Sequence, residues 1–371
     1  MPTRTIMRKR TAAHSETPPR LDPAQCFHMP AEWEPHEATW LGWPHEKTDW
    51  PGKFAPIPWA FAEIVRHLAR VERVLLLVEN AAAESEAKKI LRKSGADLHA
   101  ITFLRVPTDR GWMRDSGPIA VANQSGERTL LNFAFNGWAK YSDHKKDARA
   151  VERANRIMKQ RVVQPEHKSR RVVLEGGSID VNGRGSLLTT EECLLSSVQQ
   201  RNPGFAREDY QEMFRRYLGV TNVLWLRNGI AGDDTHGHVD DLARFVDPST
   251  VVTVVEEDPA EQNYEALQEN LALLRGMRDQ DGRELRIETL PMPKPVWFAG
   301  QRLPASYANF YIANQIVLVP VFNDPADRVA LNTLAALFPT REIVPIYCRD
   351  LVLGLGTIHC MTQQLPRIAS A

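Results

Sequence analysis

Three consecutive segments decide the fold class: Arg73-Val74-Leu75-Leu76-Leu77-Val78, then residues 82–93, then residues 101–106. The first is a continuous apolar run of strand length, which is typical of a strand buried on both faces. The second has the length and composition of a helix, and the third is strand-like again. This order of strand, helix and strand favours a fold of the α/β or α+β class.

The same alternation extends in both directions along the chain. Upstream, residues 40–44 are expected to form a short strand and 58–69 a helix. The further predicted helices are 143–160, 207–217, 260–274 and 326–338. The further predicted strands are 118–122, 129–135, 171–174, 187–188, 222–226, 244–246, 251–255, 285–290, 316–321 and 342–346. A strand–strand–helix–strand unit of roughly 60 residues fits this spacing, although no self-similar sequence repeat is visible.

The domain organisation follows from composition. Residues 27–371 contain no evident linker, so we expect them to form one catalytic domain. Residues 1–26 are polar and carry four basic residues near the start, with no apolar core of a secretory signal behind them. We therefore expect a disordered tail there and a cytoplasmic protein. No apolar run approaches the ~20 residues that a spanning helix needs.

Charge and cysteine content exclude several classes. The chain has 46 basic and 46 acidic residues, which gives no electrostatic reason to expect nucleic acid or a membrane surface as partner. Its four cysteines are too few and too scattered for a disulfide framework, and none form a Cys-x-x-Cys pair. An enzyme acting on a small molecule is the expected class.

Five side chains in separate turn-like segments make a catalytic inventory. Cys360 follows a small-residue turn, Gly354-Leu355-Gly356-Thr357, which can present a thiol nucleophile close to substrate. His238 is a candidate acid/base, and three acids accompany it: Asp115, Glu175 and Asp240. Cysteine proteases use a single orienting Asn or Asp, so acids are in excess here. Surplus carboxylates suit a cationic substrate, and a planar guanidinium group binds two carboxylates well.

These residues lie within motifs that resemble those of the agmatine deiminases. That family belongs to a guanidine-modifying superfamily that also holds bacterial peptidylarginine deiminases. The resemblance extends from about residue 29 to residue 366. It rests on six segments, which are 29–36 (MPAEWEPH), 112–115 (WMRD), 175–177 (EGG), 188–195 (LTTEECLL), 234–240 (DTHGHVD) and the Cys360 segment. It implies a five-bladed pseudosymmetric α/β propeller of ββαβ-type repeats, with the active site at its centre.

The resemblance also implies roles for individual residues. Cys360 would be the nucleophile, His238 the acid/base and Glu175 the partner that orients His238. Asp115 and Asp240 would hold the guanidinium group. The tetramethylene chain of the substrate would lie against Trp112, and its distal ammonium near Asp234.

The implied reaction converts agmatine to N-carbamoylputrescine and ammonia through a covalent S-alkylthiouronium. It needs no metal or organic cofactor and would serve polyamine (putrescine) biosynthesis. The resemblance further implies a homodimer.

Two departures from the family pattern and three alternatives remain open. The family usually has glycines and an Asn where this chain has Leu355 and Thr357, and often Asn or Asp where it has His236.

The nearest alternative is deimination of peptidylarginine or free arginine by the same residues, which would call for a cation in the outer pocket. His236 and His238 could instead hold zinc in an amidohydrolase. A non-catalytic arginine- or polyamine-binding module is the third alternative. His359 is expected to be a packed or hydrogen-bonded neighbour.

Overall fold

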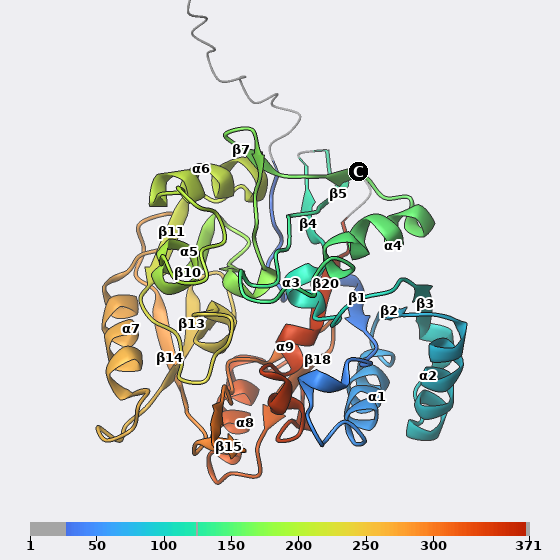
Figure 1. Ribbon diagram of the computed structural model, residues 1–371. Helices are drawn as coiled ribbons and strands as arrows, with labels where there is room; N and C mark the ends of the chain where they lie inside the picture. Colours follow the sequence, from blue (N-terminus) through green and yellow to red (C-terminus); the bar gives the residue numbers. More distant parts are fainter. Residues whose placement is uncertain (1–26, 124, 369–371) are drawn as a thin grey trace, which may run out of the picture.

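The computed structural model describes residues 27–123 and 125–368. The predicted disordered tail, residues 1–26, lies outside the described residues, so that prediction stays untested. The described chain is a mixed α/β fold built from many small sheets (Figure 1). Among the described residues, no helix has both the length and the apolar character needed to cross a membrane.

Five sets of three neighbouring strands share one arrangement. The middle strand runs antiparallel to its neighbour on one side and parallel to its neighbour on the other side. In chain order the sets are β4–β5–β6 (Ile119–Ala122, Arg128–Leu131, Val162–Val163), β9–β10–β11 (Asp180–Val181, Ser186–Thr190, Asn222–Leu226), β12–β13–β14 (Ala243–Phe245, Thr250–Val255, Arg286–Pro291), β17–β18–β19 (Tyr311–Ile312, Ile316–Val321, Glu342–Tyr347) and β20–β1–β2 (Thr362–Pro366, His36–Gly42, Arg73–Val78). The last set joins strands from near the two ends of the described chain.

Helices make the connections between parallel strands, which a tight turn cannot make. In each set one helix of at least nine residues lies in sequence between the middle and the third strand: α4 (Ala150–Met158), α6 (Arg207–Leu218), α7 (Tyr264–Gly276), α8 (Ala326–Leu337) and α1 (Ile57–Leu68). The remaining elements are α2 (Ala81–Ser94), β3 (Ile101–Arg105), α5 (Glu191–Leu195) and the two hairpins β7–β8 (Glu166–His167, Arg170–Arg171) and β15–β16 (Val296–Phe298, Gln301–Leu303).

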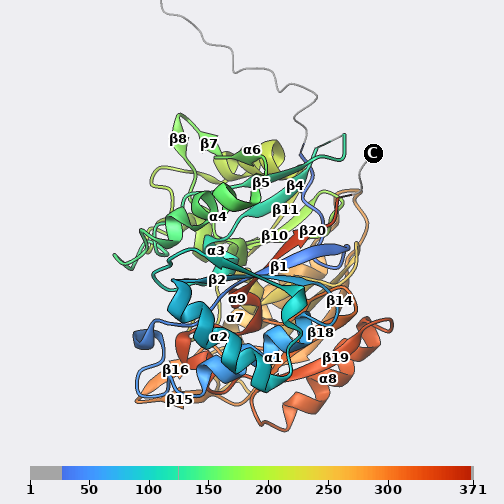
Figure 2. The same cartoon turned by 90° about the vertical axis from the view of Figure 1, so that its right-hand side faces the viewer.

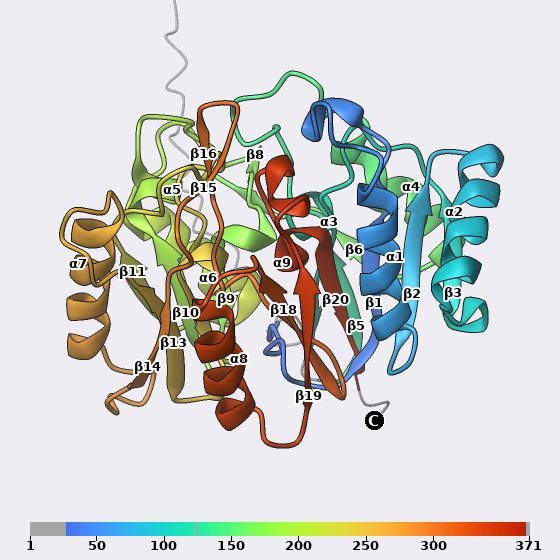
Figure 3. The ribbon, with the colours of Figure 1, turned by 90° about the horizontal axis from the view of Figure 1, so that it is seen from below.

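The long helices lie around the outside of the molecule, and two short helices lie near its middle (Figures 1 and 3). The central pair is α3 (Met113–Ser116) and α9 (Ile358–Met361), which contact one another. The largest apolar cluster runs from α1 and β2 through β13 and β18 to α9, so the centre and the outer helices share one core. The side view shows α1 and α2 covering one flank of β1 and β2 (Figure 2).

Helix α2 shows how local sequence sets an element's ends. The side chain of Asn80 accepts hydrogen bonds from the backbone N–H groups of Ala82 and Ala83, which caps the N-terminus. Gly95 ends the helix in the left-handed conformation, with φ of 79°. The prediction of a helix over 82–93 is confirmed with one extra residue at each end.

The predicted helix over 143–160 is too long, because α4 begins only at Ala150. The buried Asp147 carboxylate accepts hydrogen bonds from the backbone N–H groups of Asp109 and Arg110. The segment before Ala150 therefore binds the loop at residues 109–110 through Asp147, and it forms only a 3-10 turn, Asp147–Arg149. A charged helical pattern gives no sign of such a tertiary hydrogen bond.

The predicted strand over 171–174 is mostly absent. Only Arg170–Arg171 forms a ladder, as β8. Beyond it, Val173 forms only an isolated bridge with Ala134, and the Asn202 side chain bonds both the N–H and the C=O of Val173. The predicted helix over 260–274 likewise starts late, at Tyr264. Asp258 forms a turn there, because its carboxylate accepts a hydrogen bond from the N–H of Ala260 and its carbonyl accepts one from the N–H of Glu261.

Candidate active site

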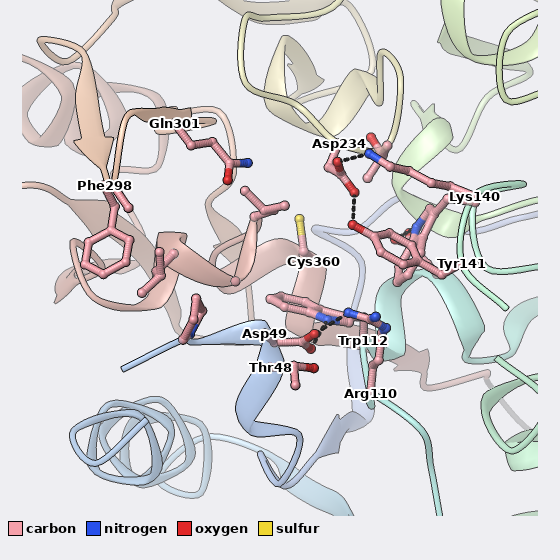
Figure 4. Close-up of a pocket in the computed structure, with 18 residues that line it drawn as sticks. Thr48, Asp49, Arg110, Trp112, Lys140, Tyr141, Asp234, Phe298, Gln301 and Cys360 are labelled. Carbon is pink, nitrogen blue, oxygen red and sulfur yellow. Dashed lines mark hydrogen bonds and ion pairs between the residues drawn. The ribbon is translucent and has the colours of Figure 1, made fainter. Parts of the chain in front are cut away.

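A cavity of about 660 Å³ opens beside the central helices (Figure 4). Cys360, Asp115, Trp112 and Asp234, four of the side chains singled out from the sequence, line it. The cavity is also lined by Thr48, Asp49, Pro51, Arg110, Trp138, Lys140, Tyr141, Thr235, Phe298, Ala299, Gln301, Leu353, Gly354 and Leu355. Residues from far-separated parts of the chain therefore form one site.

Short helical turns bring the predicted catalytic residues together. Asp115 lies in α3, and Cys360 lies in α9, which contacts α3. Glu175 precedes the turn η5 (Gly176–Ser178), and His238 precedes the turn η6 (Val239–Asp241), which contains Asp240. Turn η5 contacts both α3 and η6. All five side chains are buried.

The chain approaching Cys360 is tightly packed. Leu355 has a φ of 67°, in the left-handed region that favours glycine. A Cβ atom added at Gly356 would lie 3.0 Å from the Trp112 ring and 3.0 Å from Cβ of Cys360. The position of Gly356 therefore needs a residue without a side chain, whereas Leu355 keeps its side chain on the cavity wall at the cost of a strained backbone.

Asn309 contacts the thiol directly. Its Nδ2 group donates to Sγ of Cys360 at 3.1 Å and to Asp241 at 3.0 Å. Its Oδ1 accepts from the Thr357 hydroxyl at 2.7 Å and from the backbone N–H of His359 at 3.0 Å. Because both ends of the amide are bonded, its orientation is fixed, with the N–H group toward sulfur. Thr357, a departure from the family pattern, thus supports the nucleophile's turn through Asn309.

The His238 ring lies between carboxylates on two sides. Its Nε2 atom is 3.9 Å from Glu175, and its Nδ1 atom is 3.8 Å from Asp115 and 4.0 Å from Asp240. Neither ring nitrogen has a hydrogen-bond partner among the described residues. Burial would lower the pKa of His238, but Asp115, Cys193 and Glu175 raise it well above its usual value. The imidazole is therefore a proton donor at neutral pH.

The Glu175 carboxylate is held ionised behind His238. Burial would raise its pKa, but the guanidinium of Arg201, which donates to both carboxylate oxygens at 3.1 and 3.3 Å, and His238 lower it to about 2. Arg201 is itself fully buried and also donates to the Thr235 carbonyl. A permanent negative charge beside Nε2 therefore stabilises the protonated imidazole.

Asp115 is held on both oxygens by neutral donors. The Trp138 indole N–H donates to Oδ2 at 2.8 Å, and the backbone N–H of Gly177 donates to Oδ1 at 3.1 Å. A Cβ atom at Gly177 would lie 2.6 Å from the His238 ring, so the second glycine of the 175–177 motif is needed for space. Burial raises the pKa of Asp115 to about 6.

Asp240 has one tethered oxygen and one free oxygen. Its Oδ2 atom lies 2.6 Å from Nδ1 of His359, while its buried Oδ1 atom has no hydrogen-bond partner among the described residues. Burial would raise the pKa of Asp240, but His359 and His238 lower it below its usual value. The free oxygen is an ionised acceptor with no donor, which is unusual in a folded interior unless a ligand supplies one.

Burial also raises the pKa of the Cys360 thiol well above its usual value, and the nearby Asp240, Asp241 and Asp115 raise it further. The same two causes, burial and the charge of Asp240, raise the pKa of Asp241. The site without ligand thus holds a neutral thiol, and an incoming cation would offset the surrounding negative charge.

The outer part of the cavity carries two ion-paired cations, Arg110 and Lys140. Trp112 lines the wall as expected, and its indole N–H donates to Asp49 at 3.1 Å. Arg110 pairs with the same Asp49 and with Asp143. Asp234 accepts a hydrogen bond from the Tyr141 hydroxyl at 2.6 Å and forms an ion pair with Lys140 (Figure 4). Asp234 thus lies in the cavity with a lysine ammonium already bound.

The chain matches a known family over almost its whole length. Residues 28–366 fit the sequence profile of the Porphyromonas-type peptidyl-arginine deiminases. The chain is 34% identical to the agmatine deiminase of Pseudomonas fluorescens over 366 residues, 92% of this chain and 96% of that protein. The chain belongs to the Porphyromonas-type peptidyl-arginine deiminase family.

Solved structures of relatives share this family's fold. The agmatine deiminase of Enterococcus faecalis matches with a TM-score of 0.85 and 31% identity, covering 94% of this chain and 98% of that one. A cysteine-to-serine variant of the C. jejuni agmatine deiminase with substrate bound matches with a TM-score of 0.82 and 28% identity, covering 92% and 96%. The mixed α/β fold with many small sheets is therefore the fold of the family.

Two groups of potential metal ligands occur in this family member among the described residues, and His236 belongs to neither. The groups are Glu175, Cys193 and His238, and Asp240, Asp241 and Cys360. His236 lies 3.1 Å from the Ser196 hydroxyl and 3.6 Å from Glu192. Among the described residues, no group of three such ligands contains both His236 and His238, the pair that the sequence suggested for zinc.

The sequence did not reveal four residues that complete this family member's site. Asn309 contacts the Cys360 thiol, Trp138 holds Asp115, and Lys140 and Arg110 supply positive charge to the outer cavity. None lies in a segment that was singled out. Only their position in the fold reveals them, because a lone Asn, Trp, Lys or Arg is usually structural or solvated.

Proposed function

We propose that this chain hydrolyses agmatine to N-carbamoylputrescine and ammonia, with Cys360 as nucleophile. The observation that carries the proposal is the convergence of a buried thiol, a buried imidazole and three buried carboxylates, of which Cys360 and Asp115 line the cavity. The names and substrate-bound state of the relatives support agmatine as the substrate. This combination suits a planar cationic substrate better than acyl transfer, for which carboxylates in excess have no use.

Asp115 and Asp240 would grip the guanidinium group. Asp240 offers its free Oδ1 atom as an acceptor, and Asp115 offers a second carboxylate beside His238. Each charge-assisted hydrogen bond contributes roughly 1.5–3 kcal/mol. Two carboxylates would therefore fix the guanidinium carbon relative to sulfur.

The first half of the reaction forms a covalent intermediate. The bound cation offsets the negative charge that raises the pKa of Cys360, so the thiol can release its proton to bulk solvent while His238 stays protonated. The thiolate then adds to the guanidinium carbon. Protonated His238 gives its proton to the departing nitrogen, and ammonia leaves. The product of this half is the S-alkylthiouronium.

The second half releases the ureido product. His238, now neutral, removes a proton from water, and the resulting hydroxide adds to the same carbon. The carbon–sulfur bond breaks, Cys360 leaves as the thiolate, and the thiolate takes up the proton that the protonated ureido group must lose, which restores the neutral thiol. Glu175, held ionised by Arg201, would keep His238 oriented through both proton transfers.

We also propose the finer architecture. The five strand sets, each with its helix, would be the blades of a five-bladed pseudosymmetric propeller around the central site, within one catalytic domain of residues 27–371. The repeated strand order and the outer position of the long helices support this. A homodimer, a cytoplasmic location and a role in putrescine biosynthesis remain expectations from the family resemblance.

One observation favours a second candidate, deimination of free arginine or peptidylarginine. Both Arg110 and Lys140 line the outer cavity, where the distal end of a substrate would lie. A carboxylate or peptide carbonyl there would be attracted by these cations, whereas agmatine's ammonium must compete with Lys140 for Asp234.

The test is turnover by the purified protein with a chelator present, with ammonia and ureido product measured. Agmatine, arginine and a peptide ending in arginine are compared. We expect agmatine to have the highest kcat/KM and Cys360→Ser to abolish turnover. Cys348→Ser is the matched control, since Cys348 is equally buried but lies outside the cavity.

Faster turnover of arginine or the peptide would favour the second candidate. Loss of activity on chelation, together with full activity of Cys360→Ser, would instead indicate a metal-dependent hydrolase. Agmatine or arginine binding without any turnover would indicate a binding module.

A further inference from the structure

His359 precedes the nucleophile and is buried between two carboxylates. Its Nδ1 atom lies 2.6 Å from Oδ2 of Asp240, and its Nε2 atom lies 2.8 Å from Oε2 of Glu32. Its side chain is 1% exposed. The ring therefore links a carboxylate of the candidate site to one outside it.

The outer carboxylate is anchored on several sides. Glu32 forms ion pairs with Arg114 at 3.2 Å and Arg244 at 2.9 Å, and accepts the backbone N–H of Ile312 at 2.9 Å. Arg244 is fully buried and also pairs with Asp180. Glu32 is thus a fixed point in the core, and His359 is the only link between it and Asp240 among the hydrogen bonds of the described residues.

Both ring nitrogens of His359 lie within hydrogen-bond distance of a carboxylate oxygen. An ionised carboxylate only accepts hydrogen bonds, so a ring nitrogen bonds to it by donating its N–H group. Burial would raise the pKa of Glu32, but Arg244 and His359 lower it well below its usual value, and the pKa of Asp240 is lowered as well.

The two carboxylate oxygens of Asp240 differ in their hydrogen bonding. Its Oδ2 atom is taken by His359, while Oδ1 is buried, unpartnered among the described residues, and 4.0 Å from Nδ1 of His238. A carboxylate held by one oxygen cannot rotate freely. The tether therefore determines where the second oxygen points.

We propose that His359 is a positioning residue for substrate binding, which acts by holding Asp240 so that its free Oδ1 atom meets the guanidinium group. The inference rests on the proposed function and deepens it. Because His359 and Cys360 are adjacent in α9, the same helical turn carries both the nucleophile and the tether of the carboxylate that binds its target. The distance between sulfur and the guanidinium carbon is then set by one rigid element.

Two substitutions separate the two hydrogen bonds of the ring. The amide nitrogen of Asn in His359→Asn falls near the place of Nδ1 and can still donate to Asp240. The longer Gln in His359→Gln reaches the place of Nε2 and can donate only to Glu32. Both variants replace the ring with an amide, and both keep one of the two links, so a purely structural role predicts similar behaviour.

Substrate binding is measured by calorimetry in the Cys360→Ser background, which prevents turnover. We expect His359→Gln to weaken agmatine binding at least tenfold and His359→Asn to weaken it several times less, with similar melting temperatures for the two. Adding His359→Gln to Asp240→Asn is expected to cause little further loss, since the tether acts only through Asp240. His36→Asn, at another buried histidine that contacts Glu72 and the Glu32 carbonyl, is the matched control and should bind normally.

Equal losses in the two His359 variants, or losses that add fully to that of Asp240→Asn, would overturn the inference alone. If neither His359 variant folds, Glu32→Gln removes the far anchor, and unchanged affinity in that folded variant would overturn it. Failure of the Cys360→Ser protein itself to bind agmatine, arginine and a peptide ending in arginine would overturn the proposed function, and this inference with it.

Discussion

At the scale of single residues, we expect Lys140 in the outer cavity to affect the choice between substrates. Its ammonium occupies Asp234, the carboxylate expected to receive the distal ammonium of agmatine. The Lys140 side chain is 42% exposed, so its ion pair is worth only up to ~1 kcal/mol. The competition is therefore modest, and agmatine can displace Lys140.

Lys140→Met should raise the ratio of kcat/KM for agmatine to that for arginine by about fivefold, the factor that ~1 kcal/mol represents. The substitution frees Asp234 for an ammonium and removes a cation that attracts a carboxylate. Lys145→Met changes the net charge by the same amount, but Lys145 is exposed and lies outside the cavity. The ratio of kcat/KM for agmatine to that for arginine should therefore be unchanged in this variant. An unchanged or lower ratio in Lys140→Met would show that Asp234 does not receive the distal group.

Asp115 predicts a pH dependence. Because burial raises its pKa to about 6, the carboxylate takes up a proton as pH falls through 6 and loses its attraction for guanidinium. We expect kcat/KM for agmatine to fall on the acid side with an apparent pKa near that value.

Trp138→Phe should shift the acid-side decrease in kcat/KM (the acid limb of the pH profile) to higher pH by about one unit, which corresponds to ~1.4 kcal/mol. The variant removes the indole N–H that stabilises the ionised carboxylate. Trp59→Phe, at a half-exposed tryptophan on α1, is the control for the change of residue type. A limb that stays in place or moves to lower pH would mean that Asp115 does not control binding.

At the scale of elements, apolar runs predicted strands well and polar segments poorly. Strands β2, β11 and β18 have the bounds expected from sequence, because a continuous apolar run of strand length is typical of a strand buried on both faces. The start of α4 and most of the strand over 171–174 were wrong. In both, a polar side chain bonds distant backbone groups: Asp147 those of 109–110, and Asn202 those of Val173.

The turn before α9 makes a prediction of its own. Leu355 at φ of 67° costs about 1–2 kcal/mol relative to glycine, partly offset by its packing against the core. Leu355→Gly should change the melting temperature little, whereas the β-branched Leu355→Val should lower both the melting temperature and kcat. Leu353→Val, two residues earlier in the turn η7 (Leu351–Gly354), is the control. Equal effects at both positions would show that the backbone of Leu355 is not strained.

At the scale of the whole molecule, the sequence identified the reactive groups but not what holds them. Cys360, His238, Glu175, Asp115 and Asp240 were singled out from motifs spread over 246 positions, and the fold brings all five together. Three of their supports, Asn309, Trp138 and Arg201, come from elsewhere in the chain, and only His359 lies within one of the motifs. A supporting side chain has no local signature, because its role depends on which elements the tertiary fold brings together.

The most direct test of the central claim is to trap the intermediate. The protein is mixed with agmatine, quenched in acid during turnover and analysed by peptide mass spectrometry. We predict that the peptide containing Cys360 carries an adduct with the mass of agmatine less ammonia, and that Cys360→Ser forms none. Agmatine turnover with no adduct on Cys360, and with activity retained in Cys360→Ser, would contradict the account.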